Sequence, residues 1–190
     1  VKMIPNVPAP NTVPNRGVPP GPRAYQWQPL APATLVWAEA LDNGDPKATV
    51  PHRDKVMSIS APFSAQPAEL ARTEYRFGNM SWTDAGVALL TENDRAKRWT
   101  RTWLIDKPGA TPRKLWDRSQ EDQYGNPGTP QRADRASGVA TVVQAADVIF
   151  LSGNGASPEG ARPFLDKLNL TTLKTGRVFQ TKGRTYESAL

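Results

Sequence analysis

Residues 148–160, VIFLSGNGASPEG, begin with a run of apolar residues and continue into a glycine-rich polar loop. The same plan occurs in TLVWAEALDNGDP (34–46) and in VALLTENDRAKRW (87–99). Each apolar run is preceded by a short strand-like segment and followed by two more. Four strands that recur at a spacing of about 50 residues are typical of β-propeller blades. The spacing therefore predicts an all-β fold, a partial β-propeller of about three four-stranded antiparallel blades.

The expected blades cover residues 25–77, 78–119 and 138–181, and residues 184–190 are expected to begin a further blade. Residues 1–24 are rich in proline and poor in apolar residues, so we expect an extended N-terminal leader or linker. A propeller closes with about four to eight blades, and three are too few. Because the sequence also begins without a methionine, we expect it to be a piece of a larger protein.

The strand candidates are runs rich in β-branched and aromatic residues, bounded by turn-forming residues. They are 35–40, 55–60, 73–77, 86–92, 101–106, 113–117, 138–144, 147–153 and 176–181. Helical spacing occurs in 66–72, which is too short for a stable helix. The six tryptophans recur once or twice per unit, and we expect them to fill the spaces between blades. A β-sandwich core is the alternative interpretation of these aromatic residues.

The charge of the chain does not indicate a polyanionic partner. The formal net charge is +6, with 24 Lys and Arg against 18 Asp and Glu, but the basic residues are dispersed among acidic ones. We therefore expect an ordinary solvated surface and no nucleic-acid partner. No apolar run approaches the roughly 18 residues of a membrane span, so no membrane partner is expected. The absence of cysteine excludes disulfides and thiolate metal sites and leaves the compartment open.

The glycine-rich loop at 153–160 does not meet the requirements of a nucleophile elbow or a phosphate-binding loop. An elbow needs G-x-S-x-G, and around Ser157 the second glycine is replaced by Glu159. A phosphate loop needs Lys and then Ser or Thr after its second glycine, where this chain has Ala161 and Arg162. We therefore expect a connection between two strands and no nucleotide cofactor.

Catalytic and metal chemistry also lack support elsewhere. His52 is the chain's one histidine, and we expect it on a surface loop rather than in a Ser-His-Asp triad or a zinc site. The acidic segment LDNGDP (41–46) could bind calcium weakly, but Asn-Gly and Asp-Pro are turn formers by themselves. The sequence therefore predicts a turn there, and no catalytic residue, metal site or cofactor in this chain.

A second polar stretch, LWDRSQEDQYGNPGTP (115–130), allows two interpretations. Its charged residues are Asp117, Arg118, Glu121 and Asp122. These side chains could pair with one another around a loop that joins two blades. Alternatively, Arg118 could present its charge to a central channel and bind acidic peptides. Arg162, beside Glu159, allows the same two interpretations, so Arg118 and Arg162 are the candidate substrate-binding residues.

Several segments together resemble the N-terminal β-propeller of the prolyl oligopeptidase family of serine peptidases, in its glutamyl endopeptidase branch. They are YQWQPLAPATLVWAEALDNGDP (25–46), HRDKVM (52–57), ELARTEYRFGNMSW (69–82), ALLTENDRAKRWTRTW (88–103), LWDRSQEDQYGNPGTP (115–130) and GNGASPEGARPFLDKLNLTTLKTGRVFQ (153–180). The resemblance begins near Tyr25 and continues to the end of the sequence. Ala161 departs from it, because a charged residue would be expected there, which puts a salt bridge at that position in doubt.

This resemblance implies a propeller that limits access to a C-terminal α/β-hydrolase domain of the same polypeptide. That domain would carry Ser, Asp and His and would cleave peptide substrates after Glu. None of these triad motifs lies in the present sequence, so we expect the chain alone to be inactive. A stand-alone propeller that binds peptides or a partner protein is the alternative. A carbohydrate-active propeller would suit the tryptophans, but no pair of carboxylates can be placed across a sugar.

Overall fold

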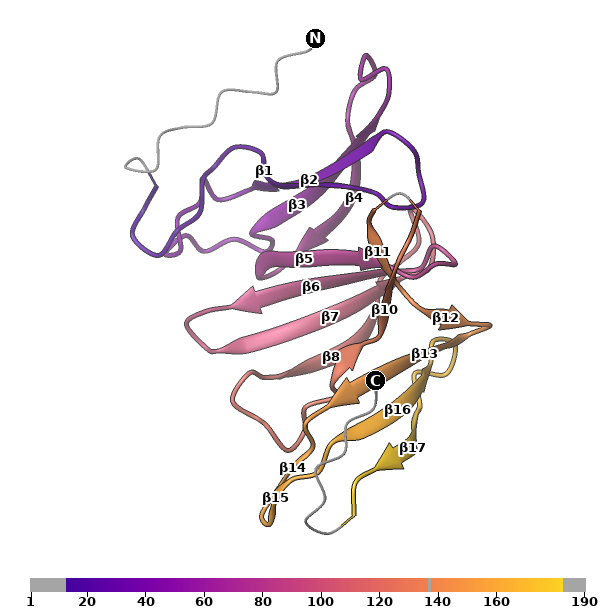
Figure 1. Ribbon diagram of the computed structural model, residues 1–190. Coiled ribbons are helices and arrows are strands. Elements are labelled where there is room, and N and C mark those ends of the chain that lie inside the picture. Colours follow the sequence, from indigo (N-terminus) through magenta and orange to yellow (C-terminus); the bar gives the residue numbers. More distant parts are fainter. Residues whose placement is uncertain (1–12, 137, 183–190) are drawn as a thin grey trace.

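The computed structural model describes residues 13–136 and 138–182, and every regular element in this part of the chain is a β-strand. The strands form three larger antiparallel sheets that follow one another along the chain (Figure 1). The first sheet consists of β1 (Arg23–Trp27), β2 (Thr34–Ala40), β3 (Asp54–Ser60) and β4 (Ala68–Thr73). The second consists of β5 (Arg76–Trp82), β6 (Ala88–Asp94), β7 (Trp99–Ile105) and β8 (Arg113–Ser119).

The third sheet has the same plan with an irregular first strand. Its main path is β12 (Gln144–Ala145), β13 (Val148–Gly153), β16 (Phe164–Asn169) and β17 (Thr175–Gln180), and β9 (Thr129–Pro130) also pairs with β13. Two hairpins accompany it: β10 (Arg132–Asp134) with β11 (Ala140–Val142), and β14 (Ala156–Ser157) with β15 (Gly160–Ala161). Among the described residues, no helix has the length and apolar character needed to cross a membrane.

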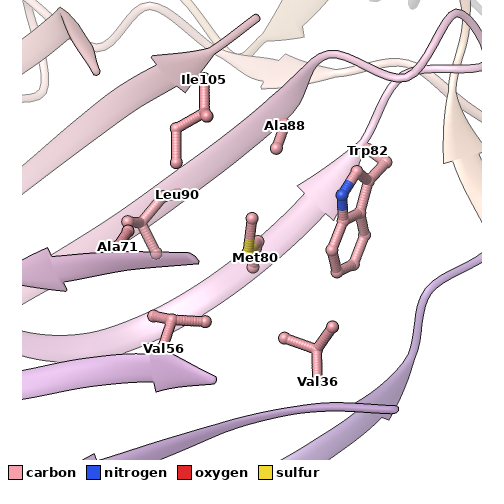
Figure 2. Packing of buried hydrophobic residues seen from close by; sticks show 8 residues of the cluster. All are labelled: Val36, Val56, Ala71, Met80, Trp82, Ala88, Leu90 and Ile105. Atoms are coloured by element: carbon pink, nitrogen blue, oxygen red, sulfur yellow. The ribbon is translucent and has the colours of Figure 1, made fainter. Parts of the chain in front are cut away.

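Two apolar clusters hold the three sheets together. The first lies between the first and second sheets and consists of Val36, Val56, Ala71, Met80, Trp82, Ala88, Leu90 and Ile105 (Figure 2). The second lies between the second and third sheets and consists of Leu89, Leu104, Val142, Ile149, Leu151, Leu168 and Leu170. Leu89 and Leu90 are neighbours on β6 but belong to different clusters, because side chains alternate across a strand. The second sheet is therefore buried on both faces, which explains its continuous apolar run.

The first strand of the second sheet lies next to β1 and next to the β10–β11 hairpin that leads into the third sheet. Gln26 of β1 donates through Nε2 to the carbonyl of Met80 on β5, at 3.0 Å. Thr83, just after β5, forms a parallel bridge with Val142 of β11. Parallel neighbouring first strands and sheets stacked face to face are the arrangement of propeller blades around their centre. The fold is thus an all-β partial propeller, as the spacing predicted.

The prediction that the tryptophans fill the spaces between blades is only partly confirmed. Trp82 is in the first cluster and Trp103 packs against it, and Trp116 packs against the second cluster, so these three fill spaces between sheets. Trp37 is buried, but it alternates with Val36 and therefore lies on the opposite face of the first sheet. For Trp27 the prediction was wrong, because this side chain is 53% exposed.

Two strand predictions were wrong. The expected strand 73–77 is instead the end of β4 and the beginning of β5, separated by a bend at Glu74 and Tyr75. The segment Ala68–Thr73 forms a strand that the sequence did not indicate, because pairing with β3 outweighs its weak intrinsic preference. The expected strand 138–144 is divided into β11, which pairs with β10, and β12, which pairs with β13.

Parts of the expected organisation lie outside the described residues, namely residues 1–12 of the leader and the further blade at 184–190. The later part of the leader contains a turn, in which the Gly17 amide donates to the Pro14 carbonyl. The next amide, that of Val18, donates to the carbonyl of Gly44 in the β2–β3 connection at 3.1 Å. This contact fixes the end of the leader against the first sheet.

The central position of the second sheet leads to a stability prediction. Leu104 has no solvent exposure and lies in the second cluster, so Leu104→Ala should lower the free energy of unfolding by about 2–5 kcal/mol. Val178, which is 52% exposed on β17, provides the control, and Val178→Ala should change it by less than about 0.5 kcal/mol. Urea titration of the two variants tests this, and equal losses would contradict the two-sided burial of the second sheet.

Candidate functional site

The connections between the second and third strands of each sheet gather along one edge of the stack, at the left in Figure 1. They are residues 41–53 in the first sheet, 95–98 in the second and 154–163 in the third. We call this side the loop edge. It places residues that are far apart in the sequence on one surface, and both predicted substrate-binding arginines belong to segments on this side.

A pocket of about 540 Å³ opens at the loop edge beside the third sheet. One wall comes from the segment 123–129, which leads out of β8, and the other from 152–164, which includes the β14–β15 hairpin. We call it the loop pocket. The prediction that the glycine-rich loop at 153–160 connects two strands is confirmed, because a hairpin follows β13 where a phosphate loop or nucleophile elbow would need a helix.

Glycines allow the two walls to approach closely. A Cβ atom on Gly155 would lie 2.0 Å from the carbonyl oxygen of Arg162, whose amide donates to the Gly155 carbonyl at 2.7 Å. On the other wall, a Cβ on Gly128 would lie 2.5 Å from the carbonyl oxygen of Ser152. Both glycines also have positive φ angles, of 61° and 85°, which side-chain-bearing residues adopt at a cost. Of the two glycines that imitated a phosphate loop, Gly155 is thus required by packing, whereas a Cβ on Gly160 would meet no atom within 4 Å.

The lining of the loop pocket is polar but uncharged. Its polar side chains are Gln123, Asn126, Thr129, Ser152, Asn154 and Ser157. Alanine, proline and phenylalanine side chains make up the rest, together with glycine backbone. No Asp, Glu, Lys or Arg belongs to the described lining, so the pocket suits a neutral polar group rather than an isolated carboxylate.

Arg118 and Arg162 flank the loop pocket without lining it. The Arg118 guanidinium donates to the carbonyls of Ser119 and Asp122 at 2.9 and 2.7 Å, which closes the loop after β8. Among the described residues it forms no ion pair with a carboxylate, so its charge is not neutralised locally. Arg162 forms an ion pair with Glu159 across the β14–β15 hairpin. The structure does not bring the two arginines into contact with each other.

Of the two interpretations of residues 115–130, the pairing of their charged side chains with one another was wrong. Asp117 pairs with Arg101 at 2.9 Å and with Lys114 at 2.8 Å, and both of these residues lie on strands of the second sheet. Glu121 pairs with Arg98 of the β6–β7 connection at 2.8 Å. Sheet formation brings Arg101 and Arg98 near these acids, which the local sequence does not reveal, whereas Lys114 lies three residues before Asp117 on the same strand.

A buried network joins the first two sheets at the loop edge. Asp42 and Asp54 have side chains with no solvent exposure, and Arg76 at the start of β5 bonds both. The distances are 2.7 Å from Arg76 Nη2 to Asp42 Oδ2 and 3.1 Å from Nη1 to Asp54 Oδ1. Arg53 also bonds Asp42, and Arg23 of β1 also bonds Asp54. We call these five residues the arginine–aspartate network.

The network confirms the turn interpretation of LDNGDP. Asp42 Oδ1 accepts the amide of Gly44 at 3.0 Å, and its other oxygen is occupied by arginines. In the described part of the chain, no group of three or more His, Cys, Asp and Glu side chains could hold a metal ion. His52 is half-buried in the same β2–β3 connection. Asp42 therefore has a structural role.

A third buried carboxylate, Glu92 of β6, fixes the connection between the first two sheets. It accepts the indole N–H of Trp103 and the amide of Tyr75, each at 2.8 Å. Sequence reasoning did not identify Glu92 or Asp54. A signal was present for Glu92, since it follows Ala88 and Leu90 at strand spacing and so falls on the buried face.

Asp117 is the acid whose titration is most clearly altered. Burial by itself would raise the pKa of Asp117. Hydrogen bonds from Lys114 and Trp99 lower it, and the hydrogen bond and charge of Arg101 lower it further, so that the pKa of Asp117 is about 2. The carboxylate is therefore held in its charged form by basic residues on neighbouring strands.

Comparison with known proteins gave two relatives in sequence, and no family model matches the chain. Both relatives are named probable glutamyl endopeptidase, chloroplastic. The one from Oryza sativa subsp. japonica is 38% identical over 180 residues, which are 90% of this chain and 19% of the relative. The one from Arabidopsis thaliana is 37% identical over 177 residues, which are 87% of this chain and 18% of the relative. The chain thus spans about a fifth of the length of the curated relatives it matches.

The solved structures that match are more distant. TolB from Acinetobacter baumannii matches 77% of this chain and 30% of its own, with 13% identity and a TM-score of 0.40. An oligogalacturonate lyase in complex with manganese matches 86% of this chain and 38% of its own, with 14% identity and a TM-score of 0.41.

The arginine–aspartate network should contribute strongly to stability. Replacing Arg76 by Met leaves two buried carboxylates short of a partner, so the free energy of unfolding should fall by about 3–5 kcal/mol. Arg98→Met is the matched control, because Arg98 pairs with Glu121 in solvent and its loss should cost less than about 1 kcal/mol. Chemical denaturation of both variants measures the difference. Similar losses would show that the network is not a stabilising link.

The low pKa of Asp117 predicts a pH dependence of stability. A carboxylate whose pKa is lowered from 3.8 to about 2 by folding stabilises the fold above its ordinary pKa and loses this effect as the pH falls toward 2. Asp117→Asn should therefore unfold at lower urea concentration than wild type at pH 6, and the gap should close between about pH 4 and pH 2. A gap that stays constant over this pH range would contradict the assignment.

Proposed function

We propose that this chain is the substrate-gating β-propeller portion of a serine peptidase that resembles glutamyl endopeptidases. The observation that carries the proposal is the identity of 38% and 37% to two proteins of that name, along nearly all of this chain. The matched residues make up 90% and 87% of this chain, so the similarity is not confined to one sheet. The propeller would restrict entry, so that short or unfolded peptides reach the catalytic residues and folded proteins do not.

The described geometry suits a rigid gate. The second sheet is clamped between two apolar clusters, and the arginine–aspartate network ties the first sheet to the second. Asp84, which follows β5, pairs with Arg135 of the β10–β11 hairpin at 2.5 Å and accepts the Gln144 amide at 3.0 Å. Contacts of this kind between first strands resist separation of the sheets. A gate needs such stiffness, because its selectivity depends on a fixed opening.

We assign the chemistry to an α/β-hydrolase domain of the same polypeptide. The support is the sequence itself, since its one histidine is His52 and no G-x-S-x-G is present. In this proposal the Glu preference belongs to the whole enzyme, and Arg118 contributes by attracting acidic peptides. Its guanidinium is bound by main-chain carbonyls rather than by a carboxylate, so its positive charge can attract an acidic ligand. Arg162 has a weaker claim, because Glu159 already neutralises it.

The test compares the 190-residue chain with the whole protein of which we propose it to be a part. A fluorophosphonate probe, which labels activated serines, should leave the chain unlabelled and should label the whole protein. The whole protein should cleave a short peptide after Glu and spare its Gln counterpart. Labelling of the chain itself would refute the division of roles, and an unlabelled whole protein would favour a propeller that only binds peptides or proteins.

The same peptide assay tests the proposed role of Arg118. Arg118→Gln should raise KM for an acidic peptide several-fold at low salt and leave kcat unchanged, because long-range attraction acts before the chemical step. Arg98→Gln is the matched control, since Arg98 lies nearby on the loop edge but is paired with Glu121. Equal effects of the two substitutions would contradict a specific role for Arg118.

A further inference from the structure

We propose that the loop pocket binds the main chain of an extended peptide, through its uncharged amide and hydroxyl side chains. The proposal rests on the proposed function in one respect, namely that peptides are the molecules this surface meets. It goes further in naming a binding site that Arg118 does not line and a mode of recognition that does not depend on charge.

The size and charge of the loop pocket fit such a ligand. Its volume of about 540 Å³ lies within the range of about 300–1,000 Å³ found for ligand sites. A charged ligand would need a countercharge inside, and the described lining contains none. Peptide groups are neutral, and each carries one donor and one acceptor. The pocket therefore favours main chain over the side chain of a glutamate.

The hydrogen-bonding groups in the pocket are of both kinds and are partly unused. Among the described residues, the side chains of Asn154 and Thr129 form no hydrogen bond. Asn126 uses its Oδ1 to accept the Gly128 amide, which leaves its NH₂ group, and Gln123 donates to Gln120, which leaves its carbonyl oxygen. An asparagine or glutamine amide offers both a donor and an acceptor, as a peptide group does. The pocket thus presents the pattern that an extended backbone can match.

The remaining lining suits the side chains of an extended peptide. Ala156 and Ala161 face each other across the β14–β15 hairpin, and Pro163 lies beyond them. Side chains and peptide groups alternate along an extended chain. The apolar part of the lining can therefore contact the side chains while the polar part bonds the peptide groups. Tyr124 lies between the lining residues Gln123 and Asn126 in the sequence and is 70% exposed. A carbohydrate could also stack on this tyrosine, but it would present hydroxyls to the apolar wall.

The walls are formed before a ligand arrives. The Arg162 amide bonds the Gly155 carbonyl, and the Ser157 hydroxyl donates to the Gly160 carbonyl at 2.7 Å, which fixes the hairpin. On the opposite wall, the Gly128 backbone packs against Ser152 too closely for any side chain. A site that is already ordered loses little conformational entropy on binding, so weak main-chain contacts suffice.

The experiment is an NMR titration of the 190-residue chain with an acetylated and amidated hexapeptide made of glycine, serine, alanine and glutamine. The amides of the lining glycines (Gly128, Gly153, Gly155 and Gly160) should shift with the peptide. They should not shift with a version that is N-methylated at alternate residues, because methylation removes main-chain donors. Equal shifts with both peptides, or no shift with either, would overturn the proposal. Shifts with a neutral oligosaccharide and none with the peptide would assign the pocket to sugars and also overturn it.

Variants of the hairpin locate the binding. Asn154→Ala removes an exposed amide and should weaken binding about fivefold, the value of one hydrogen bond. Ala156→Trp should fill the pocket and abolish binding. Pro158→Ala is the matched control, because Pro158 is on the same hairpin outside the lining, and its affinity should be unchanged. Unaltered affinity in Asn154→Ala and Ala156→Trp would place binding elsewhere and refute the site.

This titration uses no catalytic activity, so its outcome is separate from that of the proposed function. Binding of the peptide by a chain whose whole protein resists fluorophosphonate would refute the peptidase and leave the pocket established. Labelling of the whole protein together with unshifted glycine amides would support the peptidase and refute the peptide-binding role of the loop pocket.

Discussion

The relation between the first two sheets depends on one arginine that bonds two carboxylates hidden from solvent. Asp42 comes from the β2–β3 connection, Asp54 begins β3, and Arg76 begins β5. The cost of an unpaired charge at such depth is several kcal/mol, so the three residues have few alternative arrangements. The turn of the chain at Tyr75, whose amide bonds the buried Glu92, follows from the same constraint. One sheet is thereby oriented against the next.

The loop pocket is a consequence of this stacking. Its two walls leave different sheets, one after β8 and the other after β13, and they meet because Leu104 and Leu151 pack in a shared cluster. The pocket is neutral even though charged residues surround it, because those residues are paired at the sheet surfaces or bound to main chain. Arg118 and the pocket therefore offer a ligand two separate kinds of attraction, one of charge and one of hydrogen bonding.

Much of the strand content could be predicted, because strands such as β6, β7 and β13 combine apolar, β-branched and aromatic residues between clear turns. Ala68–Thr73 lacks these features and is a strand because β3 offers it a ladder. Residues 138–144 have a strand composition, yet they divide into two short strands, because β11 pairs with β10 and β12 pairs with β13. The strand preference of a local segment does not show which distant strand it will pair with. The same limit applies to the candidate site. The sequence identified Arg118 and Arg162 as charged residues, but it did not identify the groups that they bond.

The sequence by itself determined the repeated four-strand unit and the exclusion of phosphate-loop chemistry from residues 153–160. These follow from side-chain alternation and from the identity of a few neighbouring residues, which are local properties. Only the tertiary structure decided which carboxylates are buried and which arginine, among the described residues, has no acidic partner. It also decided that segments 123–129 and 152–164 enclose a pocket. The reason is physical. A local pattern sets the face on which a residue lies, whereas the distance between two loops depends on how whole sheets pack.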